Sequence, residues 1–127
     1  MFSISTSDNR LKNKDEILAL VFPQHSPDSM AISIQLLGKS SVYEGKLGDL
    51  DFVVLTDNSG ANRVFETRGI KFVDYDQDSG LTDSNGRQWL LSEDKLSGNG
   101  MELARLPAHR AFWFGWHAAY PDTILIN

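Results

Sequence analysis

Three side chains near the end of the chain could carry acid–base chemistry, namely His109, His117 and Asp122. A histidine beside a carboxylate is a common general base, so His109 and Asp122 form the candidate catalytic pair. A hydrolase would also need a nucleophile, and none is evident, because the chain has no cysteine and Ser92 and Ser97 are ordinary loop serines. A hydrolase-like enzyme that uses His109 with a nearby carboxylate is therefore the alternative hypothesis.

The same stretch gives the leading hypothesis, a binding surface. The candidate ligand-binding residues are Arg110, Trp113 and His117, which lie off or at the edge of the face that we expect to be packed. The two histidines, eight positions apart, would lie roughly 12 Å apart along a helix, too far to share a metal ion unaided. The sequence therefore favours a non-catalytic module that binds an unknown protein or small-molecule ligand.

Three aspartates at alternate positions, Asp74, Asp76 and Asp78, resemble the start of a calcium-binding loop. An EF-hand loop requires glycine at its sixth position and a bidentate glutamate at its twelfth. Here Gly80 occupies the seventh position and Asn85 the twelfth. The three aspartates are thus only weak metal candidates in a solvated acidic loop. We expect no metal, no cofactor and no stabilisation by millimolar Ca²⁺.

The candidate residues belong to an aromatic stretch that must be packed. Its members are Phe112, Trp113, Phe114, Trp116 and Tyr120. Burial of three such side chains would contribute roughly 11–19 kcal/mol of transfer free energy, at ~25 cal/mol per Å². Pro107 suits the first turn of a helix and Pro121 ends one, which predicts a helix over residues 108–120.

That helix places Phe112 and Trp116 on one central face, and truncation of either should be strongly destabilising. Gly115 in mid-helix weakens the helix relative to alanine, so we expect it to pack closely against another backbone. We also expect Trp116 and Trp89 to be buried and close to each other, because both terminate strong apolar signals.

Upstream of the aromatic stretch, short apolar segments alternate with turn residues about every ten positions, which is typical of strands. We expect strands over residues 15–22, 31–37, 42–44, 51–55, 63–67, 70–75, 87–91 and 123–126. Residues 92–100 are expected to form a loop and 102–106 to lead into the helix. The predicted fold class is α+β and β-rich, with a mostly antiparallel sheet or partly closed barrel and one C-terminal aromatic helix.

Length and charge exclude several classes of protein. The 127 residues suffice for one domain, expected over 14–127, with residues 1–13 as a loose N-terminal arm. A net charge of −5 offers no basic stripe for phosphates, which argues against a nucleic-acid partner. No run approaches the ~20 apolar residues of a membrane span, and no signal-peptide pattern opens the chain. We therefore expect no membrane span and, by default, a cytoplasmic protein.

Several short motifs follow one another along the C-terminal half of the chain: Asp83-Ser-Asn-Gly-Arg-Gln-Trp89, Leu103-Ala-Arg-Leu-Pro107, Trp116 and Tyr120-Pro-Asp-Thr123. The chain thereby resembles the C-terminal part of a bacterial family of unknown function, DUF3179. Upstream, Asp51-Phe-Val-Val-Leu-Thr56 and Ala61-Asn-Arg-Val-Phe65 are similar to the paired strands of that family. The resemblance covers most of residues 15–126. It supports the fold and implies no activity, since the family has no established one.

The chain departs from the family pattern in two respects. Many relatives carry a cysteine-containing motif between the paired strands, where this chain has Thr56-Asp-Asn-Ser-Gly60. The resemblance therefore implies no thiol or thiol-bound metal chemistry here. Relatives are usually longer and often exported, so the chain resembles a reduced member of the family.

Overall fold

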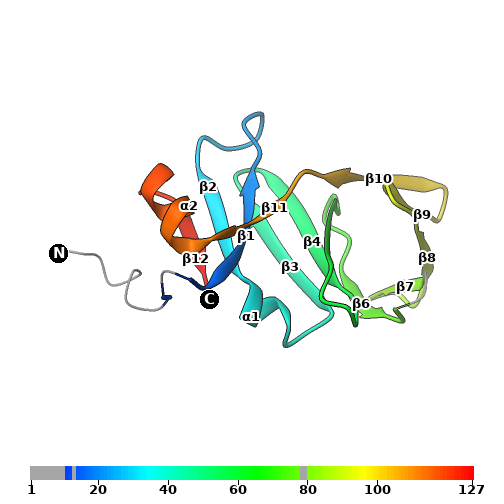
Figure 1. Ribbon diagram of the computed structural model, residues 1–127. Coiled ribbons are helices and arrows are strands. Elements are labelled where there is room, and N and C mark those ends of the chain that lie inside the picture. The colour runs from blue at the N-terminus through cyan, green and yellow to red at the C-terminus, as the bar shows by residue number, and fades with distance from the viewer. Residues whose placement is uncertain (1–10, 13, 78–79) are drawn as a thin grey trace.

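The computed structural model describes residues 11–12, 14–77 and 80–127. These residues form a small sheet, a larger curled sheet beside it and two short helices (Figure 1). The elements in chain order are β1 (Glu16–Val21), β2 (Ser29–Ser33), α1 (Ile34–Leu37), β3 (Val42–Leu47), β4 (Leu50–Thr56), β5 (Asn62–Glu66), β6 (Phe72–Tyr75), β7 (Gly80–Asp83), β8 (Gln88–Leu91), β9 (Lys95–Gly98), β10 (Met101–Leu106), β11 (His109–Phe112), α2 (Trp113–Ala119) and β12 (Ile124–Ile126).

The small sheet has the strand order β11–β1–β2–β12, and only the β2–β12 pair among these is parallel. The larger sheet is antiparallel throughout its described strands and has the order β3–β4–β5–β10–β9–β8–β7–β6. The chain passes from the larger sheet to the small one where β10 runs on into β11 (Figure 1).

The larger sheet curls into a nearly closed barrel, because its outermost strands, β3 and β6, come together. The backbone N–H of Phe72 in β6 donates to the Glu44 carboxylate of β3 at 3.1 Å. Gly45 follows Glu44, and a Cβ there would stand only 2.6 Å from the Phe52 ring. A larger residue at this position would therefore push the β3–β4 pair apart. The β-rich, mostly antiparallel fold with a partly closed barrel is confirmed.

β1 is covered on both faces, which explains its continuous apolar run. Leu18 and Leu20 face the barrel, whereas Ile17 and Ala19 face α2. All four are at most 3% exposed. Because successive side chains of a strand point to opposite faces, a strand between two layers must be apolar at every position. The predicted strand over 15–22 is confirmed.

β4 has the same property at the barrel wall. Phe52 and Val54 face the small sheet, and Val53 and Leu55 face the barrel interior. The interior of the barrel is filled by Val53, Leu55, Phe65, Phe72, Tyr75, Leu81, Trp89, Leu96 and Leu103. The molecule thus has four layers: α2, the small sheet, the β3–β4–β5 wall and the remaining strands of the barrel.

Trp89 is the largest side chain of the barrel interior and is 1% exposed. Its indole N–H donates to the buried Asp83 carboxylate at 3.0 Å. The hydrogen bond from Trp89 is the main cause that lowers the pKa of Asp83, and the backbone N–H groups of Arg87 and Asn85 add to it. Gly98 makes room for the indole, since a Cβ there would lie 2.8 Å from the ring.

The helix predicted over residues 108–120 is wrong in its first half. His109–Phe112 forms strand β11, and the helix α2 comprises Trp113–Ala119 alone. Residues 102–106, expected to lead into the helix, form β10. Backbone pairing of β11 with the edge of β1 outweighs the helical pattern of the aromatic residues. This pairing gives hydrogen-bond partners to backbone N–H and C=O groups of both strands.

Three further expectations need correction. The predicted strand over 31–37 ends at Ser33, whose hydroxyl accepts the Leu36 N–H at 3.4 Å and begins α1. The predicted loop over 92–100 contains strand β9. Trp89 and Trp116 are both buried but belong to separate cores, so their expected proximity is wrong. Neither helix formed by the described residues is long and apolar enough to cross a membrane.

Candidate functional site

Helix α2 is held on the small sheet by two tryptophans. Trp113 and Trp116 are 3% and 7% exposed and pack against Ile17, Ala19 and Ala31. The backbone N–H of Trp113 also donates to the Asp15 carbonyl at 2.8 Å. Because the helix has only seven residues, these contacts rather than its own propensity keep it folded.

The turn after α2 is tied to the sheet through Thr123. The Thr123 hydroxyl oxygen accepts the Trp116 indole N–H at 3.1 Å and the Ser29 hydroxyl at 2.8 Å. Tyr120 stacks on Trp116 with a centroid distance of 4.1 Å. The Tyr120-Pro-Asp-Thr123 motif therefore fixes the end of the helix over β2.

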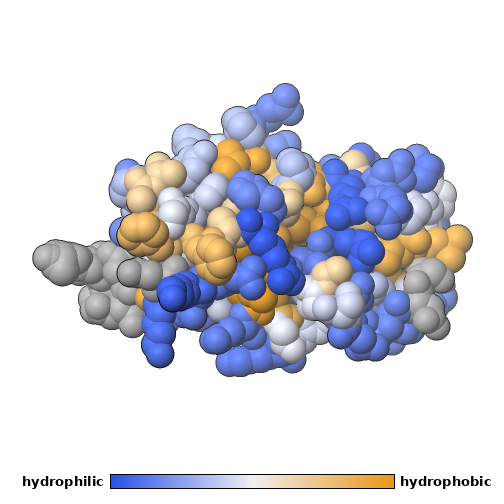
Figure 2. Space-filling view, in the orientation of Figure 1, coloured by the Kyte–Doolittle hydropathy of each residue, from blue (hydrophilic) through white to orange (hydrophobic). Residues whose placement is uncertain are grey.

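The outer side of this region exposes aromatic rings. Phe112, Phe114 and Tyr120 are 60%, 64% and 42% exposed, and we call these three side chains the α2 surface. Figure 2 shows hydrophobic side chains over α2 and β11 on the face in view. Gly115 belongs to the same helix, and no atom of the described residues lies within 4 Å of an added Cβ there, so its expected close packing is wrong. The expected burial of Phe112 is wrong as well, since it belongs to an edge strand.

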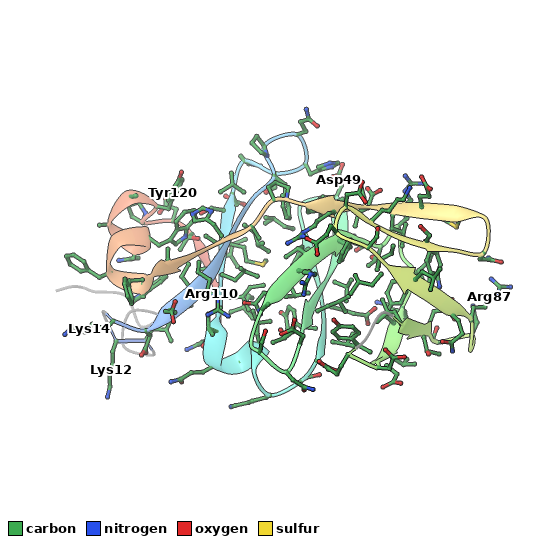
Figure 3. All side chains as sticks on the ribbon, turned by 45° about the vertical axis from the view of Figure 1, so that its right-hand side comes forward. Lys12, Lys14, Asp49, Arg87, Arg110 and Tyr120 are labelled. Carbon is green, nitrogen blue, oxygen red and sulfur yellow. The ribbon has the colours of Figure 1, made fainter. Side chains whose placement is uncertain are left out.

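A pocket of about 280 Å³ adjoins Tyr120. It is lined by Val21 and by residues 27–29 and 119–123, and we call it the acidic pocket. Its charged lining residues are Asp28 and Asp122, and no lysine or arginine lines it. Within the described part of the chain, neither carboxylate has an ion-pair partner. Tyr120, one of the pocket's lining residues, is labelled in Figure 3.

The structure does not join His109 to Asp122. His109 is exposed and meets Trp116 edge-on, with ring centroids 5.5 Å apart. Among the described residues, no hydrogen bond or ion pair links it to a carboxylate. A histidine–carboxylate pair does form between His25 and Asp49, at 2.8 Å. It is exposed and lies outside the pockets described here, so it resembles a surface contact.

The three predicted ligand-binding residues have different surroundings. Trp113 is buried beneath His117, which stacks on it at a centroid distance of 4.9 Å. Arg110 donates to the Gly60 carbonyl and, at 3.0 Å, to the Asn62 side-chain oxygen (Figure 3). Its guanidinium therefore joins β11 to the β4–β5 turn. Of the three, His117 is half-buried and lies within α2.

The described residues on the two sides of the acidic loop are bonded to each other. The Asp76 carboxylate accepts the Gly80 N–H at 3.0 Å, and Asp74 is exposed in β6. Asp78 lies outside the described residues. In the part of the chain that the structure describes, no three histidine, aspartate or glutamate side chains gather into a metal-binding group.

Sequence reasoning named Asp122 as a candidate residue but missed Asp28, which lines the same pocket. Asp28 and Asp122 line one pocket although 94 positions separate them, because β12 pairs with β2. No local motif carries that information. The exposure of Phe114 could have been inferred from its position opposite the packed face of the helix, where the sequence pattern placed it.

A family model described as Protein of unknown function (DUF3179) matches residues 1–123. The match spans nearly the whole chain rather than only its C-terminal part. Comparison with curated proteins and with solved structures gives no match. The chain is a member of the DUF3179 family of proteins of unknown function.

Proposed function

We propose that the protein is a non-catalytic binding module that holds a segment of a partner protein on the α2 surface. The observation that carries this proposal is the exposure of Phe112, Phe114 and Tyr120 around α2, together with the acidic pocket that Tyr120 helps to line. Large aromatic side chains are typical anchors of protein interfaces. Among the described residues, Phe112 and Phe114 belong to none of the cores, and Tyr120 only covers Trp116 at the edge of one.

The acidic pocket supports a cationic side chain in the partner. Asp28 and Asp122 supply negative charge, and the Tyr120 ring supplies an aromatic face. A lysine or arginine over such a ring gains about 0.5–2 kcal/mol from the cation–π interaction. The fitting partner segment therefore carries a cationic side chain next to apolar ones.

Gly115 adds a steric argument. Glycine weakens a helix by about 1 kcal/mol relative to alanine. Its Cβ position is open in this protein, so internal packing does not require glycine there. A partner that approaches the helix backbone closely would require it. The glycine is thus consistent with contact at the α2 surface.

The hydrolase-like alternative has less support from the geometry. It needs His109 beside a carboxylate and a nucleophile, whereas the described contacts of His109 are with the Trp116 ring. The acidic pocket contains Asp122, and Ser29 there is buried and bonded to Thr123. The binding module is therefore the better-supported function.

Selection from a random peptide display library tests the proposal. Wild-type protein should enrich peptides in which arginine or lysine adjoins an apolar residue. The Asp28→Asn/Asp122→Asn variant should bind those peptides at least about tenfold more weakly, a loss of ~1.4 kcal/mol. Asp74→Asn is the matched control, because Asp74 is exposed on the barrel, away from the acidic pocket.

Two results would overturn the proposal. One is a selection that enriches no peptide family above the background of the immobilisation surface. The other is enrichment of peptides whose affinity is unchanged in the double variant. Loss of affinity in the Asp74→Asn control would point to general charge attraction by an acidic protein and would also count against a specific site.

A further inference from the structure

A second pocket, of about 360 Å³, lies at the other side of the small sheet from α2, where α1 and the β4–β5 turn meet. We call it the polar pocket; its principal lining residues are Lys39, Ser40, Thr56, Asp57, Asn58 and Gln77. It shares no lining residue with the acidic pocket. The polar pocket is therefore independent of the proposed function.

Gln77 is the unusual member of the polar pocket. Its side-chain Oε1 atom is buried and has no hydrogen-bond partner among the described residues. Its backbone has a φ of 78°, in the left-handed region that residues other than glycine seldom adopt. Buried acceptors in proteins are nearly always satisfied, and strained backbone is concentrated at functional sites. A bound donor group would complete this position.

The pocket also contains separated opposite charges. The Lys39 ammonium has no ion-pair or hydrogen-bond partner among the described residues. The Ser59 hydroxyl, ahead of the Ala61 and Ser59 backbone N–H groups and Arg63, lowers the pKa of Asp57 to about 2, so this carboxylate is ionised. Its Oδ2 accepts only the Arg63 donor, at 3.1 Å, and retains capacity for another.

The turn that carries Asp57 is fixed before any ligand arrives. Asp57 Oδ1 accepts three donors, the Ser59 N–H, the Ser59 hydroxyl and the Ala61 N–H, at 2.9, 2.6 and 3.1 Å. Arg110 reaches from β11 to the Gly60 carbonyl. Because these contacts already fix the β4–β5 turn, the turn loses little conformational entropy when a ligand binds.

We propose that the polar pocket binds a small zwitterion of the free amino-acid type. Its carboxylate would pair with Lys39, and its ammonium group would donate to Asp57 and to the orphaned Gln77 oxygen. A ligand with only one of the two charges would lack either the ion pair with Lys39 or the hydrogen bond to the Gln77 oxygen. The pocket therefore selects for both charges on one small molecule.

Two-dimensional ¹H–¹⁵N NMR of the labelled protein tests this proposal with glycine, L-alanine and L-serine as probes. At about 10 mM, ten times a dissociation constant of ~1 mM, these should shift the amide signals of Gly38 and Gly60. Acetate and methylamine, each carrying one of the charges, should bind at least about tenfold more weakly.

Two variants and two controls complete the experiment. Lys39→Gln and Gln77→Gly should each weaken amino-acid binding about tenfold or more. Lys14→Gln is the control for loss of a lysine, since Lys14 lines neither pocket. Arg68→Gly is the control for backbone relief, because Arg68 also has a positive φ, 52°, and lies outside the polar pocket.

The proposal is overturned if the amino acids shift neither glycine signal at that concentration. It is equally overturned if acetate or methylamine acts as strongly as the amino acids, or if both pocket variants retain wild-type affinity. The peptide selection described above does not depend on these residues, so the two proposals can fail separately.

Discussion

Trp89 and Trp116 are both buried, and each donates its indole N–H to a side-chain oxygen, yet their surroundings differ. Trp89 bonds to Asp83 inside a filled barrel whose other interior residues are apolar. Trp116 bonds to Thr123 at the edge of the molecule, under exposed aromatic rings. The same kind of hydrogen bond thus lies inside a closed core in one place and beneath an exposed surface in the other.

The difference indicates where function is to be sought. Inside the barrel, the large side chains pack against one another, and Gly98 leaves room for the Trp89 indole. Around α2, buried tryptophans hold Phe112 and Phe114 in water, where they contribute nothing to the core. Exposed apolar surface of this kind marks interaction sites.

The largest expected effect is loss of the barrel tryptophan. Trp89→Ala should lower the free energy of unfolding by about 3–5 kcal/mol, through lost transfer free energy and a large cavity. Trp116→Ala should lower the free energy of unfolding less, because α2 lies at the edge of the molecule and can move into the space that the indole leaves. Urea denaturation of both variants measures the difference, and a milder effect for Trp89→Ala would break the comparison.

Acid should affect the barrel through Asp83. Its pKa is lowered on folding, chiefly by the Trp89 hydrogen bond, so ionised Asp83 stabilises the folded state above its unfolded pKa of about 3.9. That stabilisation is lost as the pH falls through the lower folded pKa. Thermal melts between neutral and acid pH should show a shallower decline for Asp83→Asn. Trp89→Phe should lose stability at a higher pH than wild type; an unchanged profile in both would contradict the assignment.

At the α2 side, Thr123→Val should cost about 1–3 kcal/mol. It removes the acceptor of Trp116 and of Ser29 and leaves their donors unsatisfied. Thr123→Ser keeps the hydroxyl and serves as the control. Chemical denaturation should show recovery of most of the lost stability in the serine variant, and equal losses would mean that the methyl group matters instead.

Gly115→Ala gives a smaller effect of opposite sign. The added methyl group meets no atom within 4 Å, so the helix should gain up to about 1 kcal/mol. If a partner approaches here, the same variant should bind selected peptides more weakly. A destabilised Gly115→Ala protein would show that the open space is filled in solution.

The sequence predicted the elements whose signal is local. Continuous apolar runs indicate β1 and β4, and the turn residues between strands indicate the hairpins. β9 was missed because Lys95–Gly98 has only one large apolar residue, Leu96, and depends on its neighbours for pairing. β11 was misassigned because its partner, β1, lies more than ninety positions away.

The sequence predicted which stretch of the chain forms the candidate site, but not which of its side chains are exposed or line the pocket. The aromatic stretch and the Pro-Asp-Thr turn were recognised as the focus of the chain. The division of its rings into buried and exposed sets follows from a helix that starts at Trp113 rather than at position 108. Asp28 enters the pocket only through the parallel pairing of β2 with β12.

The central claim is that the exposed rings of the α2 surface serve binding and not folding. It is tested most directly by two matched double variants, Phe112→Ser/Phe114→Ser and Val73→Ser/Leu90→Ser. The phenylalanines are 60% and 64% exposed, and the barrel pair is 61% and 67% exposed. Both unfolding free energies and affinities for the selected peptides are to be measured.

We expect both double variants to unfold within about 0.5 kcal/mol per site of wild type, as exposed positions usually do. Only the phenylalanine variant should lose peptide affinity, by at least about tenfold. Contradiction would come from a phenylalanine variant that unfolds like a core variant, or from one that binds the peptides as well as the Val73→Ser/Leu90→Ser protein does.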